Sequence, residues 1–82
     1  MDYLNDLELL RLISTRLERI PIDSRLAHRA SGIRGSLLSI IEKMDKSQIV
    51  PQAETEYLIK LGFDILERAA SERVRGVSLL QR

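Results

Sequence analysis

The chain of 82 residues contains no cysteine and no tryptophan, and it has only three aromatic residues. Without cysteine it can form neither a disulfide nor a thiolate metal site. His28 is the only histidine, so no multi-histidine site can form within one chain. We therefore expect no metal and no cofactor. A chain this short buries only about 60–65% of its unfolded surface, so it depends on good packing or on a partner subunit.

Long apolar runs and a strong net charge are also absent. No stretch approaches the roughly 20 apolar residues that cross a bilayer, and the acidic amino terminus does not resemble a signal peptide. We expect a cytoplasmic protein with no membrane association. The net charge is +1, but residues 11–34 carry mainly arginines and residues 35–67 mainly acids. Such alternation can guide helix pairing or head-to-tail contacts as easily as ligand binding.

Apolar residues recur at intervals of three and four, and no stretch alternates as a strand would, which predicts three helices. The first spans about residues 2–20 and ends before Pro21, since a proline disfavours helix in the preceding residue. Its inward positions are Tyr3, Leu7, Leu10, Ile13, Leu17 and Ile20. The second spans about 24–46, with Asp23 or Ser24 as its N-cap. Its inward positions form a regular seam: Leu26, Ala30, Ile33, Leu37, Ile40 and Met44.

The third helix spans about residues 51–75. Pro51 suits the first turn, where its missing N–H costs nothing, and Gly76 suits a C-terminal stop. The tail 76–82 could continue the helix, fold back or stay loose. Connections this short favour antiparallel neighbours. The sequence therefore predicts a single all-α domain over residues 1–82, an up-down-up three-helix bundle completed by homo-oligomerisation.

Two glycines, Gly32 and Gly35, fall inside the second helix. The seam keeps its phase on both sides of them, which favours one continuous helix despite a cost of ~1 kcal/mol per glycine. At ~100° per residue they lie on the face opposite the seam, in an outer stripe that consists of His28, Gly32, Gly35 and Ser39. Small residues let another backbone approach closely. We expect the contact surface to be this stripe with its flanking Arg25 and Arg29.

Apolar residues are also in surplus. Those of the third helix cover more than half of its circumference, more than two neighbours in a monomer would bury, and the first helix adds leucines outside its inward face. Surplus apolar surface on a short chain favours self-association. We expect oligomer contacts at Leu9, Leu12, Phe63 and Leu66. The predicted function is a non-enzymatic interaction or regulatory module, a homodimer that can also bind another protein.

The segment "AHRASG", residues 27–32, suggests an alternative. It resembles the phosphorylated segment of histidine-containing phosphotransfer domains, in which a histidine accepts a phosphoryl group and a glycine four residues on leaves room for the partner. The resemblance implies that His28 would be phosphorylated beside Gly32. Ser31 stands where that family has lysine, and the family uses a four-helix core, so a dimer would have to complete the bundle.

The sequence gives less support to two further functions. The arginines of residues 11–34 could form a basic corner for nucleic acid, but Glu18 and Asp23 interrupt them and no aromatic residue lies among them. Nucleic-acid regulation is thus a second alternative, and we do not expect such binding. Catalysis is not expected either. The chain has no glycine-rich phosphate loop, and a small bundle offers no deep pocket.

Overall fold

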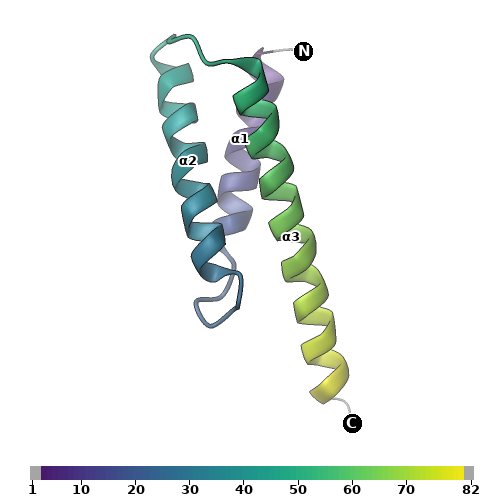
Figure 1. The fold of residues 1–82 in the computed structure, drawn as a ribbon. Helices are drawn as coiled ribbons and strands as arrows, with labels where there is room; N and C mark the ends of the chain where they lie inside the picture. The colour runs from purple at the N-terminus through teal and green to yellow at the C-terminus, as the bar shows by residue number, and fades with distance from the viewer. Residues whose placement is uncertain (1–2, 81–82) are drawn as a thin grey trace.

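The computed structural model describes residues 3–80, with side chains from residue 5 to residue 72. It contains three helices, α1 (Tyr3–Glu18), α2 (Ala27–Asp45) and α3 (Gln52–Leu80), and each helix packs against the other two. The chain runs along α1, returns along α2 and reverses again into α3, so α1 and α3 are parallel (Figure 1). No strand occurs among residues 3–80. The predicted all-α, up-down-up three-helix bundle is confirmed.

The start of α2 differs from the prediction. The helix begins at Ala27, and its N-cap residue Leu26 makes no side-chain capping hydrogen bond. Ser24 instead acts within the preceding turn, where its Oγ accepts a hydrogen bond from the Leu26 N–H at 3.1 Å. The expectation that Asp23 or Ser24 caps the helix is therefore wrong. The serine satisfies a backbone donor of the turn, and the helix starts one turn later.

The end of α3 also differs. The Pro51 carbonyl accepts the N–H groups of Glu54 and Thr55 at 3.1 and 3.3 Å, so the helix begins beside the proline, as predicted. It does not stop at Gly76 but continues to Leu80. A glycine ends a helix when it adopts the left-handed conformation, and this one stays helical. The predicted tail is thus helical up to Leu80. Residues 81–82 of that tail, and residues 1–2 and the Tyr3 side chain of the predicted first helix, lie outside the described parts.

The end of α2 is closed by a left-handed residue that is not glycine. Ser47 has φ 57°. Its N–H donates to the Met44 carbonyl at 3.0 Å, and the Gln48 N–H donates to the Lys43 carbonyl at 2.8 Å. This pair of bonds is the Schellman motif, which satisfies the last carbonyls of a helix. The chain then turns into the connection before α3.

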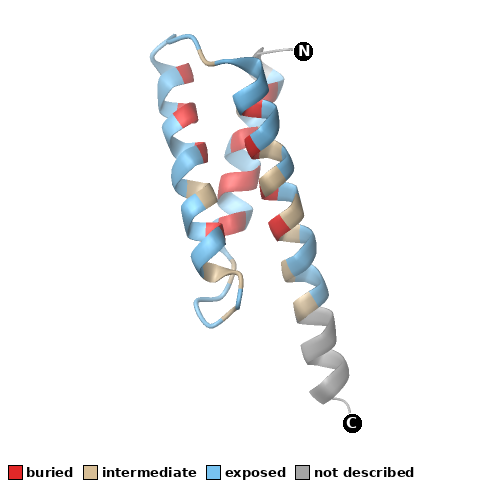
Figure 2. Cartoon of the chain, viewed as in Figure 1, coloured by how far each residue is buried: buried red, intermediate tan, exposed pale blue. Residues whose placement is uncertain are grey.

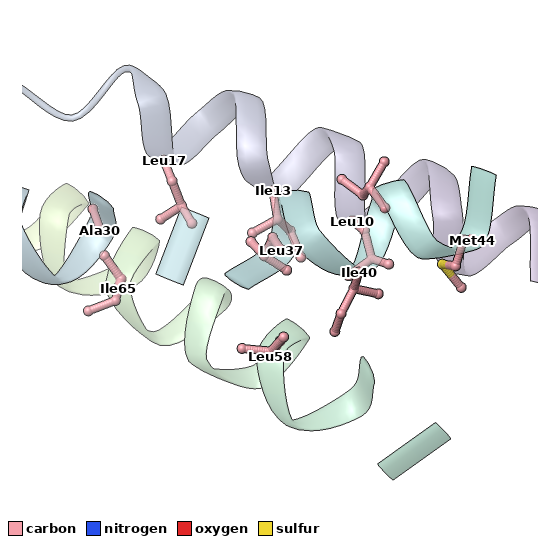
Figure 3. Close-up of a cluster of buried hydrophobic side chains, with 10 residues drawn as sticks. Leu10, Ile13, Leu17, Ala30, Leu37, Ile40, Met44, Leu58 and Ile65 are labelled. Carbon is pink, nitrogen blue, oxygen red and sulfur yellow. The ribbon is translucent and has the colours of Figure 1, made fainter. Parts of the chain in front are cut away.

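The core lies along the common axis of the three helices. The predicted seam of α2 faces inward: its residues 30, 37, 40 and 44 are buried and 26 and 33 partly buried. Buried positions face the interior of the bundle, and the outer side of α2 is exposed (Figure 2). The core side chains interdigitate from all three helices (Figure 3). They are Leu10, Ile13, Leu17, Ala30, Leu37, Ile40, Ile41, Met44, Leu58 and Ile65.

The parallel helices α1 and α3 approach closely at Gly62. A Cβ built on this glycine would overlap the Ile13 Cγ2 and lie 3.8 Å from the Ile13 Cβ. Gly62 is buried, and Ile13 is only 1% exposed. Near the start of both helices, the Gln52 Nε2 donates to the buried Asp6 Oδ2 at 3.2 Å. These contacts set the register between α1 and α3.

Candidate functional site

The outer stripe of α2 lies where the sequence predicts it. The helix runs without interruption through Gly32 and Gly35, and neither glycine has positive φ. All four residues of the stripe are exposed, and so are the flanking Arg25 and Arg29. A Cβ built on Gly32 or Gly35 would meet no atom within 4 Å. The stripe therefore faces away from α1 and α3 with open space above it.

The glycines fall into two kinds. Gly62 is needed for packing within the chain, because Ile13 occupies the space of its missing side chain. Gly32 and Gly35 have no such neighbour, yet each lowers the stability of the helix by ~1 kcal/mol relative to alanine. No contact within the described part of the chain explains why glycine stands at positions 32 and 35.

The four predicted oligomer contacts lie on α1 and α3. Leu9 and Leu66 are partly buried and pack against the core, while Leu12 and Phe63 are 51% and 49% exposed. Leu12 precedes Ile13 and Phe63 follows Gly62 on parallel helices, and because Ile13 and Gly62 are in contact, Leu12 and Phe63 lie within two residues of the same level. We call the surface formed by Leu9, Leu12, Phe63 and Leu66 the α1–α3 face.

A hollow of about 270 Å³ continues this surface toward the carboxyl end of α1. Two exposed arginines, Arg16 and Arg19, line this hollow together with apolar side chains of α3 and Ile20. Its complete lining is Arg16, Arg19, Ile20, Leu66, Ala69 and Ala70. This hollow could not be predicted from the sequence, because it joins residues about 50 positions apart and depends on the register between α1 and α3.

The two candidate surfaces lie on opposite sides of the bundle. The stripe lies on the face of α2 away from the other helices. On α1, Arg11 and Glu18 turn toward α2 and pair with Asp45 and Arg34, so Leu12 lies on the side away from α2. An isologous contact uses the same patch on both copies. A contact between the stripe of one copy and the α1–α3 face of another would instead be heterologous.

The predicted basic corner is partly neutralised within the chain. Two nitrogen–oxygen contacts of 2.8 and 3.0 Å join the Arg11 Nη2 to Asp45, and the Arg34 Nη2 lies 3.7 Å from the Glu18 Oε1. The other four arginines of residues 11–34 are exposed and make no ion pair with a described residue. They are Arg16, Arg19, Arg25 and Arg29.

The described residues form neither a metal site nor a membrane-spanning helix. No group of three or more histidine, aspartate or glutamate side chains in this part gathers so that it could hold a metal ion. Among the helices as described, none is both long enough and apolar enough to cross a membrane.

The exposed imidazole of His28 lies on the outer stripe, one turn before Gly32.

Comparisons with known proteins gave no match: no family model fits the chain, and neither a search of curated sequences nor one of solved structures found a significant relative. A function must therefore be inferred from the surfaces of the molecule itself. Those surfaces are the outer stripe and the α1–α3 face, which have different chemistry. The stripe consists mainly of small residues and is flanked by arginines, whereas the α1–α3 face is apolar.

Proposed function

We propose that the protein is a non-enzymatic, cytoplasmic interaction module that acts by self-association and by contact with another protein. The observation that carries the proposal is the open space over Gly32 and Gly35 in an uninterrupted, exposed helix. Two residues that destabilise the helix, and that no contact with the described residues requires, are explained if a second backbone lies against them. The lack of cysteine agrees with a reducing compartment.

Surface geometry supports binding more than catalysis. Four hollows among the described residues range from about 200 to about 370 Å³ and are open to solvent, which is at or below the lower end of the usual range of ligand pockets. Leu12 and Phe63 leave about half of their surface exposed, as expected for residues that a partner covers. The stripe offers a different surface, where a helix could approach closely between basic side chains.

Light scattering of the purified full chain, over a wide range of concentrations, tests self-association. The expected mass rises above the 9.4 kDa of one chain toward that of a dimer. A mass that stays at one chain throughout this range would refute self-association.

The stripe is tested separately with a photo-crosslinking amino acid in place of Arg29, in cells that express the protein. Arg29 flanks the stripe and is exposed with a long side chain, so this change keeps both glycines. Position 57 is the control, because Tyr57 is also exposed on a helix but lies outside the stripe. We expect a discrete adduct from position 29 and none from position 57, and the absence of any adduct specific to position 29 would refute a contact at the stripe.

Phosphotransfer through His28 is a second candidate. His28 is exposed, and the open space over Gly32, one turn on, would let a partner reach the imidazole. An imidazole nitrogen is a competent nucleophile near neutral pH, and Arg25 and Arg29 could steady the charge. With acetyl phosphate, the nitrogen would attack phosphorus and release acetate. Acid-labile label on the wild type and not on His28→Gln would support this function, and no label on either would reject it.

A further inference from the structure

We propose that a hollow at one end of the bundle, beside the buried Asp6, binds a primary ammonium group with an aliphatic chain. The connection between α2 and α3 lies at the end of the bundle where α1 begins (Figure 1), and a hollow of about 300 Å³ opens there. We call it the Asp6 hollow. Its buried lining residues are Asp6, Met44 and Thr55, and its exposed ones are Gln48, Ile49 and Gln52.

The carboxylate of Asp6 is the charged group of this hollow. Asp6 is 2% exposed, and the neutral amide of Gln52 donates the one described hydrogen bond to it, at 3.2 Å. No lysine or arginine lines the hollow, and Asp6 makes no ion pair with a described residue. The positive ends of α1 and α3 favour a carboxylate here, but its removal from water costs more than a helix end returns. A cation therefore gains from pairing with Asp6.

The hydroxyl of Thr55 is a second enclosed group that lacks a partner. The Thr55 side chain is 1% exposed, and its hydroxyl makes no hydrogen bond with any described residue. A hydroxyl this enclosed gains from a hydrogen-bond partner. The hollow thus presents three kinds of oxygen acceptor, namely the carboxylate, this hydroxyl and the side-chain oxygens of its two glutamines.

The chemistry of the hollow fits a primary ammonium group better than a metal ion. An ammonium group has three N–H donors and no acceptor, which match these oxygen atoms. A calcium ion takes about six to eight oxygen ligands, and no group of three or more acidic or histidine side chains gathers among the described residues. Met44 and Val50 also line the hollow and offer an apolar surface to an aliphatic chain. A lysine side chain and a free alkylamine share this chemistry.

Titration of the full chain with n-butylammonium, followed by NMR spectroscopy of the backbone amides, tests the site. We expect saturable shifts at residues around the hollow, with a dissociation constant in the millimolar range, because the ligand has few atoms. The ligand control is n-butanol, which has the same aliphatic chain without the charge and should bind at least tenfold more weakly. No saturable shift at the hollow, or equal binding of the two ligands, would overturn the proposal.

Substitutions test the two enclosed groups. Asp6→Asn keeps an oxygen that can accept from Gln52 but removes the charge, so it should weaken n-butylammonium binding roughly tenfold or more. Glu54→Gln is the matched control, because it removes one charge from the first turn of α3, outside the hollow, and should leave binding unchanged. If circular dichroism shows that Asp6→Asn is less helical, Thr55→Val replaces it, with an expected loss of about fivefold. Unchanged binding in the helical variant, or equal weakening by Glu54→Gln, would overturn the proposal.

A capped lysine, N-acetyl-lysine methylamide, distinguishes the two sources of the ammonium group. If it binds as tightly as n-butylammonium or more tightly, the hollow takes a lysine side chain of another protein. If it binds more weakly, the hollow takes a free alkylamine, and both results support the ammonium site. None of these titrations requires a dimer, so a monomeric chain would overturn self-association and leave this inference standing.

Discussion

Gly62→Ala is the sharpest test of the fold, because the structure predicts its sign as well as its size. Alanine is preferred over glycine in a helix by ~1 kcal/mol, so the change should stabilise an open position. At Gly62 the new Cβ would overlap the Ile13 Cγ2. A β-branched side chain in a helix has one strongly preferred χ1 rotamer, so this methyl group cannot swing away. The helices α1 and α3 would have to separate.

Two matched variants isolate the steric effect. Gly32→Ala and Gly35→Ala change the same atoms in a helix interior, but their Cβ meets nothing within 4 Å, so each should stabilise the protein by ~1 kcal/mol. Overpacking a core costs about 1–3 kcal/mol. The helix preference cancels in the comparison, so Gly62→Ala should be less stable than either control by about 1–3 kcal/mol.

Urea unfolding followed by circular dichroism measures these differences, at one fixed protein concentration because association adds to apparent stability. A second test uses Ile13→Leu, which moves the branch away from Cβ at nearly constant volume. The penalty of Gly62→Ala should shrink in this background. If Gly62→Ala stabilised the protein as much as the control variants do, the close approach of α1 and α3 at this position would be refuted.

Three other substitutions test single features. Ser47→Gly should raise stability by up to ~1 kcal/mol in urea unfolding, since Ser47 has φ 57° and glycine enters this region without strain; a loss of stability would contradict the left-handed cap. Gln52→Ala should lower the free energy of unfolding by about 1–3 kcal/mol, because it removes the hydrogen-bond donor to the buried Asp6. The control is Gln48→Ala, which changes an exposed glutamine nearby. If both variants lost the same stability, the hydrogen bond between Gln52 and Asp6 would not stabilise the protein. Arg34→Met should leave the stability in thermal unfolding nearly unchanged or raise it. The buried Arg34 Nε has no hydrogen-bond partner among the described residues, and the Arg34 Nη2 lies 3.7 Å from the Glu18 Oε1, a long ion pair. A large loss of stability would show that this ion pair stabilises the protein.

The bundle itself could be predicted because its pattern is local. The seam of α2 keeps one phase from Leu26 to Met44, and that phase alone places Gly32 and Gly35 on the outer side. The helix ends were less predictable. A serine near a helix start can satisfy a turn instead of the helix, as Ser24 does. A glycine ends a helix only where it turns left-handed, and Gly76 lies within α3.

What could not be predicted depends on contacts between distant parts of the chain. Nothing near Gly62 in the sequence indicates that Ile13 lies against it. Surplus apolar residues were equally ambiguous, since Leu9 and Leu66 pack partly on the core while Leu12 and Phe63 remain half exposed. Periodicity says which face a residue occupies, but the spacing between neighbouring helices decides how much of that residue is covered.

The parallel pairing of α1 and α3 also bears on how the chain folds. Its hydrogen bond between Asp6 and Gln52 joins residues 46 positions apart, whereas α1 and α2 are neighbours in the chain. Closing the longer loop costs more entropy, so we expect the contacts at Gly62 to form after the α1–α2 hairpin. Interactions that form late change the rate of unfolding more than the rate of folding. Gly62→Ala should therefore shorten the lifetime of the native state and leave the refolding rate nearly unchanged.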